Sequence, residues 1–221
     1  MKKKFICIMI VFGTALSLYA QKTFSFLGKD LRYGIRGGMT LSSFTGNENS
    51  VGKLGWLIGA DFEIPIEKVS ENFFIQPSLL IISKGDESTT GTVDIGGGDT
   101  GETTVTENAI YLEIPITAAY RLNLKKVSFV FNAGPYLAFG LGGKSKLETN
   151  ATIFGSEIGG GYEANTFDNI KRFDCGLAAG IRIEFLKHWS YGVQYDFGFI
   201  NLAEYGDTKN SAMLVSIGYR F

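Results

Sequence analysis

Apolar and polar residues alternate over most of this 221-residue chain. The last segment shows the pattern most clearly. Met213, Val215, Ile217, Tyr219 and Phe221 share one parity, and small or polar residues hold the other. Because successive side chains of a strand point to opposite faces, the segment predicts a strand with one apolar face. No residue of the printed chain follows Phe221 to cover that face, so we expect a lipid bilayer to cover it.

Seven other segments keep their apolar residues on one parity in the same way, and no segment predicts a convincing helix. The eight predicted strands are residues 31–41, 54–66, 73–84, 110–121, 127–142, 172–185, 190–202 and 212–221. Short connections alternate with long ones, and aromatic residues recur at both strand ends on the apolar parity. Both features are typical of membrane barrels. The sequence therefore predicts an all-β fold, an eight-stranded antiparallel up-and-down transmembrane β-barrel.

Two long connections, residues 85–109 and 143–171, are predicted to be loops, and the first is predicted to be a solvated, flexible surface loop. The first contains six acidic residues and no basic one. Such a segment would suit cations or basic partners, or serve only as a solvated surface. Function specific to this protein is expected in these loops, because loops carry most binding residues.

The N-terminus predicts a secretory signal peptide over residues 1–20, with a basic start followed by an apolar run that ends before Gln21. A retained membrane anchor is the alternative, but the apolar run is shorter than the roughly 20 residues of a spanning helix. We expect residues 21–30 to form a periplasmic N-terminal segment and residues 31–221 to form the barrel. Cleavage removes three lysines and no acid, which takes the net charge from −1 to −4. That charge does not favour nucleic acid as a partner.

The polar parity carries basic and acidic residues in nearly equal numbers. An eight-stranded barrel encloses little more than its own side chains, and buried charges are tolerated only when paired. We therefore predict a structural network of ion pairs that fills the lumen. The alternative is a selective pore or a proton path. The predicted members are Arg32, Arg36, Asp61, Glu63, Lys84, Glu113, Arg121, Arg172, Asp174, Arg182, Glu184, Asp196 and Arg220.

Catalytic chemistry finds little support. The one histidine, His188, lies in a short turn, and zinc-ligand spacing is lacking. Residues 142–145 resemble the end of a phosphate-binding loop, but Ala138 stands where the motif requires its first glycine. We predict no catalytic, cofactor-binding or metal-binding residue, no cofactor and no enzymatic activity. An enzyme acting on lipid is a remote alternative, since it lacks a convergent nucleophile and base.

Six short segments, taken in order, resemble the outer-membrane β-barrel family of Bacteroidetes-type bacteria, also described as porin-family or PorT-like barrels. They are residues 33–38, 75–80, 111–116, 133–137, 173–177 and 218–221. The resemblance implies an eight-stranded barrel in the bacterial outer membrane. It does not imply one activity, because the family includes a secretion-system component. The terminal strand, with Tyr219 and Phe221, also resembles the signal that barrel-assembly machinery recognises.

Together these observations predict a non-enzymatic outer-membrane barrel with a structural or surface-interaction role. Its expected partners are outer-membrane lipid, the barrel-assembly machinery through the C-terminal strand, and extracellular or secretion-system proteins. One alternative is a transport or protein-secretion component, or a small pore. A second is a soluble lipocalin-type ligand-binding barrel, which would need the opposite parity, with apolar residues inside.

Overall fold

The computed structural model describes residues 24–26, 29–45, 50–96, 99–153, 156–168, 170–203 and 208–221. The predicted signal peptide, residues 1–20, lies outside them. The strands are β1 (Phe24–Phe26), β2 (Lys29–Thr45), β3 (Lys53–Pro65), β4 (Phe73–Gly96), β5 (Asp99–Asn123), β6 (Val127–Ile153), β7 (Ser156–Asn165), β8 (Phe173–Phe185), β9 (Trp189–Gly198) and β10 (Lys209–Arg220), with a 3-10 turn at Thr166–Asp168. Within the described ranges, no helix is long and apolar enough to cross a membrane.

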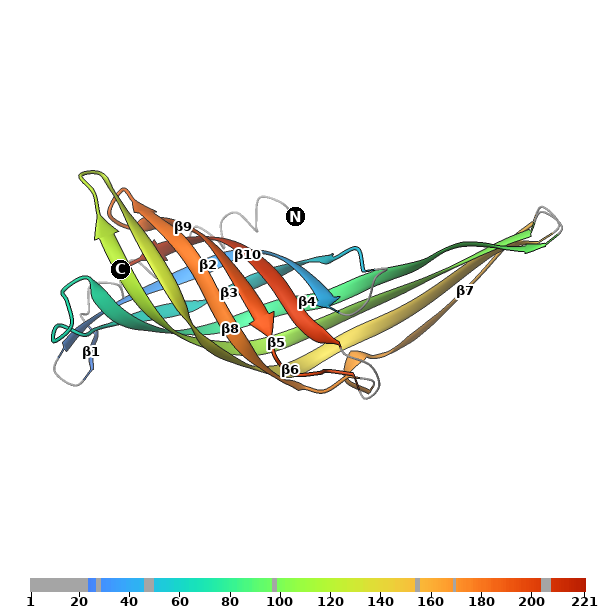
Figure 1. Cartoon of the computed structure of the whole chain (residues 1–221), viewed down its shortest axis with the longest axis horizontal. Helices are drawn as coiled ribbons and strands as arrows, with labels where there is room; N and C mark the ends of the chain where they lie inside the picture. The colour runs from blue at the N-terminus through green and yellow to red at the C-terminus, as the bar shows by residue number, and fades with distance from the viewer. Residues whose placement is uncertain are drawn as a thin grey trace, which may run out of the picture.

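Eight strands form a closed antiparallel ring (Figure 1). Around the ring the order is β2, β10, β9, β8, β6, β5, β4 and β3, and β3 pairs with β2 to close it. The terminal strand β10 pairs with β2 from Lys209 opposite Thr45 to Arg220 opposite Gly34. Closure leaves no unpaired edge at bilayer depth, which is what a strand-built membrane protein requires. The predicted eight-stranded antiparallel barrel is confirmed.

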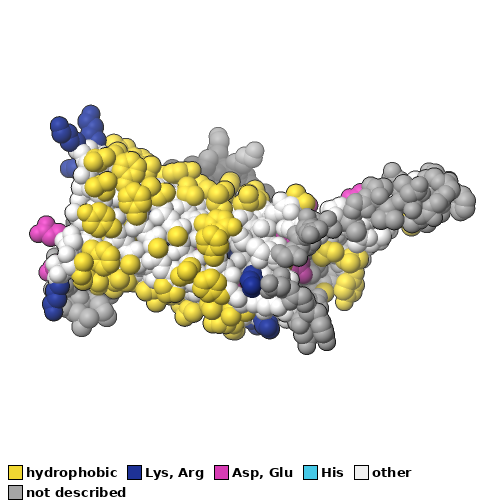
Figure 2. Space-filling model, in the orientation of Figure 1, with side chains coloured by type: hydrophobic (Ala, Val, Ile, Leu, Met, Phe, Trp, Pro, Cys, Tyr) yellow, Lys and Arg dark blue, Asp and Glu magenta, His cyan; other side chains and the backbone are white. Residues whose placement is uncertain are grey.

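The apolar parity of the ring faces outward. Met39, Ile58 and Phe197 expose more than half of their surface, and apolar side chains cover much of the barrel wall (Figure 2). The soluble lipocalin-type alternative is wrong, because it needs these residues inside. An outward apolar band of this kind is stable only in contact with lipid.

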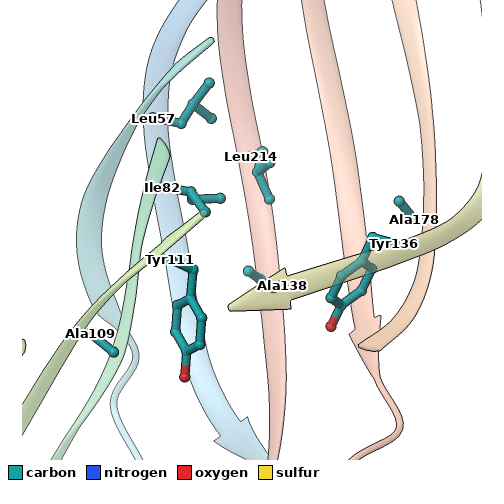
Figure 3. Close-up of a cluster of buried hydrophobic side chains, with 9 residues drawn as sticks. Leu57, Ile82, Ala109, Tyr111, Tyr136, Ala138, Ala178 and Leu214 are labelled. Carbon is teal, nitrogen blue, oxygen red and sulfur yellow. The ribbon is translucent and has the colours of Figure 1, made fainter. Parts of the chain in front are cut away.

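The lumen also contains a hydrophobic cluster, which the alternation of polar residues did not lead us to expect (Figure 3). Tyr111 and Tyr136 point inward and are fully buried. Their neighbours in the cluster are Leu57, Ile82, Ala109, Ala138, Ala178, Ala212 and Leu214. Charged and apolar layers together fill the inside of the barrel.

The two ends of the barrel differ. Three short connections, near residues 66–72, 124–126 and 186–188, lie at one end, which we call the turn end. Phe221 also lies there, with its ring 5.1 Å from that of Tyr33. Within the predicted N-terminal segment, residues 21–30, strand β1 pairs with the start of β2. Leu31, predicted to face lipid, is buried.

The opposite end carries a sheet in place of two predicted loops. Strands β4, β5 and β6 continue past the barrel and β7 pairs with β6, so four antiparallel strands project away from it (Figure 1). We call this extension, residues 86–96, 99–108, 144–153 and 156–165, the projecting sheet. The prediction of loops over residues 85–109 and 143–171 is wrong. Runs such as Thr103–Thr106 are β-branched, and each strand supplies the backbone partners of its neighbour.

Candidate functional site: the charged lumen and the projecting sheet

The half of the lumen nearest the turn end contains a dense ion-pair network centred on Glu63. Arg121 Nη2 and Arg182 Nη2 donate to the Glu63 carboxylate at 2.6 and 2.9 Å. Arg220 Nη1 lies 2.6 Å and Arg32 Nη1 3.5 Å from the same group. The carboxylate is buried, so each arginine reduces the cost of keeping it away from water.

Two other carboxylates complete this turn-end network. Glu184 lies 3.1 Å from both Arg121 and Arg182 and 3.3 Å from Arg220. Asp61 lies 3.1 Å from Arg36 Nε and 3.4 Å from Arg220 Nη2. The N–H groups of Arg36 Nε and Arg220 Nε are not aligned for hydrogen bonds. The contact of Arg36 Nε with Asp61 and that of Arg220 Nε with Glu184 are therefore ionic. Five arginines therefore face three carboxylates, which leaves this half of the lumen with excess positive charge.

A second network fills the half of the lumen nearest the projecting sheet. Lys84 Nζ donates to Glu113 Oε2 at 2.6 Å and to Asp196 Oδ2 at 3.0 Å, and all three side chains are fully buried. The ammonium group also lies 4.6 Å from the centre of the Tyr136 ring. Strands β4 and β9 are opposite each other in the ring, so the contact between Lys84 and Asp196 crosses the whole lumen.

One glutamine, Gln194, links the two networks, and a second, Gln76, extends the turn-end network. Gln194 donates to Asp196 Oδ1 at 2.8 Å and accepts a 3.4 Å hydrogen bond from Arg36. Gln76 accepts a 2.7 Å hydrogen bond from Arg182. The cavity among these side chains has a volume of about 20 Å³. That is space for about one water molecule.

The structure brings most of the predicted lumen residues together, with three differences of detail. Arg172 is exposed, where it donates to Gly140 O at 3.1 Å and lies over the Phe167 ring, apart from the two networks. Arg32 lies at the rim with a side chain 43% exposed. Asp174 is buried but accepts hydrogen bonds from Tyr136 at 3.1 Å and Asn210 at 2.9 Å, so its described partners are neutral.

Sequence reasoning missed the neutral members of the lumen. Gln76, Gln194, Tyr136 and Asn210 contact the charged residues directly. Parity was the available signal, because each of them lies on the inward-facing side of its strand. The inward-facing positions carry charged side chains and also the amides and hydroxyls that a buried charge needs as hydrogen-bond partners.

The projecting sheet reverses the polarity of the barrel wall. Val105 lies on the parity of the lumen-facing Ala109, and its cross-strand partner is Leu147, which in turn pairs with Tyr162. These three define a row that we call the apolar row. Tyr162 is 70% and Leu147 43% exposed. Ile158 continues this face and is also exposed.

The opposite face of the projecting sheet is polar and charged. Lys144 and Lys146 lie 3.1 and 3.0 Å from the Glu163 carboxylate. The hydrogen bond from Lys146, followed by that from Lys144, holds the pKa of Glu163 below its usual value. This face continues the parity that meets lipid on the barrel, so its change to polar residues indicates that the bilayer ends before the projecting sheet begins.

Two acidic residues meet where the barrel becomes the projecting sheet. Asp86 and Glu107 are directly opposite each other on β4 and β5. Asp86 accepts hydrogen bonds from Ser50 Oγ and, at 3.2 Å, from the Phe44 N–H. Burial, reinforced by Asp86, raises the pKa of Glu107. Within the described residues, no group of three or more histidine, cysteine, aspartate or glutamate side chains is placed to hold a metal ion.

A closed strand ring with an outward apolar band and a polar, filled lumen defines a transmembrane β-barrel protein. The family comparison agrees: the model of the outer membrane protein beta-barrel domain matches residues 19–204. The chain belongs to this family, and its location is the bacterial outer membrane. A search of curated proteins found no significant match.

Solved structures of outer membrane proteins are similar at low sequence identity. The attachment invasion locus protein Ail of Yersinia pestis, solved with the heparin analogue sucrose octasulfate, is 15% identical with a TM-score of 0.41, covering 86% of this chain and 99% of Ail. Neisserial surface protein A is 10% identical with a TM-score of 0.37, covering 86% and 97%. A major outer membrane protein from Thermus thermophilus is 12% identical with a TM-score of 0.40, covering 87% and 100%.

Proposed function

We propose that this protein is a non-enzymatic outer-membrane barrel that contacts a protein partner outside the cell through its projecting sheet. In this proposal the closed barrel anchors the protein in the membrane, and the projecting sheet binds the partner. Short periplasmic turns and longer external segments are the usual arrangement of bacterial barrels, which puts the projecting sheet outside. The assembly machinery would then recognise the terminal strand through Tyr219 and Phe221.

The apolar row carries this proposal. Leu147 and Tyr162 are exposed on a surface that lies beyond the lipid-facing band. Apolar side chains in register across three strands, two of them exposed and with a charged face behind them, are typical of protein interaction sites. Strand β7 pairs with β6 alone among the described strands, so its other edge also offers backbone groups to a partner.

The filled lumen supports a closed anchor and opposes a pore. Ion pairs cross the barrel at two levels, from Glu63 to Arg182 and from Lys84 to Asp196. With one water-sized cavity of about 20 Å³ among these side chains, we expect no steady ion conductance. Single-channel recordings in planar bilayers test this directly, and reproducible open levels would favour the pore alternative.

Site-specific photo-crosslinking tests the interaction. A photo-crosslinking phenylalanine derivative placed at Leu147 should form discrete adducts in intact cells. The same group at Lys146, the adjacent residue on the charged face, is the matched control and should form few or none. Adducts of equal strength at both positions, or at neither, would contradict the proposal.

A PorT-like secretion role is the remaining alternative. It predicts a deletion strain with reduced protein secretion and crosslinks to envelope proteins from the turn end. A surface-interaction role predicts normal secretion and loss of contacts in a Leu147→Ser, Tyr162→Ser variant. Comparing the secreted proteins of the deletion strain and of that variant separates the two roles.

A further inference from the structure

An open cavity of about 330 Å³ lies at the turn end, where two connections meet the mouth of the lumen. The β5–β6 turn and the β8–β9 turn form its walls, and Arg32 and Arg121 line it from the barrel. Figure 2 shows basic side chains at this end of the molecule, with acidic ones among them. We call the cavity the basic cup, after the cationic residues that line it: Arg32, Arg121, Lys125, Lys126 and Lys187.

Three of the five cations of the basic cup have no ion pair within the described residues. Lys125, Lys126 and Lys187 make no ion pair or hydrogen bond with any described residue. The one carboxylate in the lining, Glu184, is already held by three arginines at 3.1 to 3.3 Å. By contrast, Lys146 on the projecting sheet is paired with Glu163.

Arg32 adds donors suited to an oxyanion. Arg32 lines the cup, has one described ion pair, at 3.5 Å, and has a side chain that is 43% exposed, so it keeps N–H donors for a ligand. Guanidinium groups bind phosphate through paired hydrogen bonds, and lysines add point charges. These guanidinium donors and lysine charges best suit an anion that has several acceptor oxygens and more than one negative charge.

We infer that the basic cup is a phosphate-binding site. The cup is larger than a phosphate ion and lies within the size range of small-molecule sites, so it would admit a phosphate that carries a substituent. A free phosphate and a phospholipid headgroup share the chemistry that the cup recognises. The site is separate from the projecting sheet, so the test of phosphate binding does not depend on the proposed function.

The β8–β9 turn provides a variant that removes a charge without harming the fold. Leu186 and Lys187 have φ angles of 50° and 67°, in the left-handed region. Glycine adopts that region without steric cost, so Lys187→Gly should keep the turn. Lys126→Gln removes a second charge from the neighbouring turn.

Rates of lysine acylation, resolved by mass spectrometry, test the site in the full barrel. In dodecyl maltoside, inorganic phosphate at an ionic strength matched with sodium chloride should slow acylation of Lys125, Lys126 and Lys187 several-fold. Lys68, exposed in the third turn at the same end but outside the cup, is the control and should not change. Lys187→Gly and Lys126→Gln should each weaken phosphate protection at the remaining lysines by roughly two- to five-fold.

A second arm identifies the source of the phosphate. If a lipid headgroup occupies the basic cup, phosphatidylglycerol nanodiscs should protect the cup lysines more than they protect Lys68, and free phosphate should add little. If free phosphate protects the cup lysines in the detergent while phosphatidylglycerol nanodiscs protect them no more than Lys68, the ligand is soluble. If the cup lysines are protected no more than Lys68 in both arms, the inference is overturned.

Discussion

Glu63 and Arg182 come from strands on opposite sides of the ring, β3 and β8, and Arg182 Nη2 donates to Glu63 Oε1 at 2.9 Å. One ion pair thus spans the barrel at this level. The same glutamate also receives Arg121 and Arg220, from two further strands. Four strands that are distant in the sequence are tied together by one carboxylate, so the network acts as an internal brace as well as a plug.

Replacing that carboxylate should destabilise the barrel strongly. Glu63→Gln leaves the arginines of the turn-end network facing two carboxylates in place of three. Removing one partner of a buried ion pair costs about 3–5 kcal/mol, and we expect a loss of that order in the free energy of unfolding. Urea unfolding followed by tryptophan fluorescence measures it. Glu102→Gln, at an exposed position of the projecting sheet, should change the value by less than about 0.5 kcal/mol. Equal effects would refute the brace.

Two substitutions in the Lys84 cluster are expected to lower the free energy of unfolding by different amounts. Lys84→Met leaves two fully buried carboxylates, Glu113 and Asp196, without their shared cation. We expect this to cost about 3–5 kcal/mol. Glu113→Gln leaves one lysine paired with one aspartate, so it should cost about 1–3 kcal/mol, the value of a lost charged hydrogen bond. Unfolding of both variants under the same conditions tests the order, and the reverse order would contradict the cluster described above.

The pair formed by Asp86 and Glu107 predicts a dependence on pH. Burial and Asp86 raise the pKa of Glu107 in the folded state, so the folded protein holds this proton more tightly than the unfolded chain. Stability from this group is therefore fully present below the unfolded pKa and is lost as pH rises through the folded pKa.

Glu107→Gln removes the effect. At pH 7 the variant should be more stable than the parent by about 0.2–1 kcal/mol, the range for like charges opposite each other in a sheet. At a pH below both pKa values of Glu107 the difference should disappear. Thermal unfolding at pH 7 and at about pH 4 measures the two differences. A difference that grows on acidification would show that the sign is wrong.

Close strand packing predicts which glycines tolerate a methyl group. A Cβ at Gly176 would overlap the backbone oxygen of Phe197 and lie 2.7 Å from the Tyr136 ring. Gly176→Ala must therefore move β9 away or displace a buried aromatic ring, at a cost of about 1–3 kcal/mol or more. Gly142→Ala is the control, because no atom lies within 4 Å of its Cβ position. Measured melting temperatures that fall equally in both would contradict this packing.

Much of the barrel could be predicted from local chemistry. Alternation identified the eight strands, because a side-chain period of two is a property of the strand itself and a lipid-facing wall must be apolar. It also identified the inward parity, and with it most of the charged lumen residues. The projecting sheet was missed because its strands lack an outward apolar face. Thr103 and Val105 form strand through pairing with β4 and β6, which no local pattern reports.

Residue identity therefore established the fold class, the membrane location and the stock of lumen charges. Which charged residues pair in the lumen was decided only by the closed ring. Glu63 meets Arg182 because β3 and β8 are opposite, and Arg172 stays outside the networks although its parity is correct. Pairing of β6 with β8, with Val127 opposite Phe185, also brought together the two turns that carry Lys125 and Lys187, and so produced the basic cup. Which side chains meet across the lumen depends on the hydrogen-bonded register around the whole barrel. Register is a property of the assembled sheet.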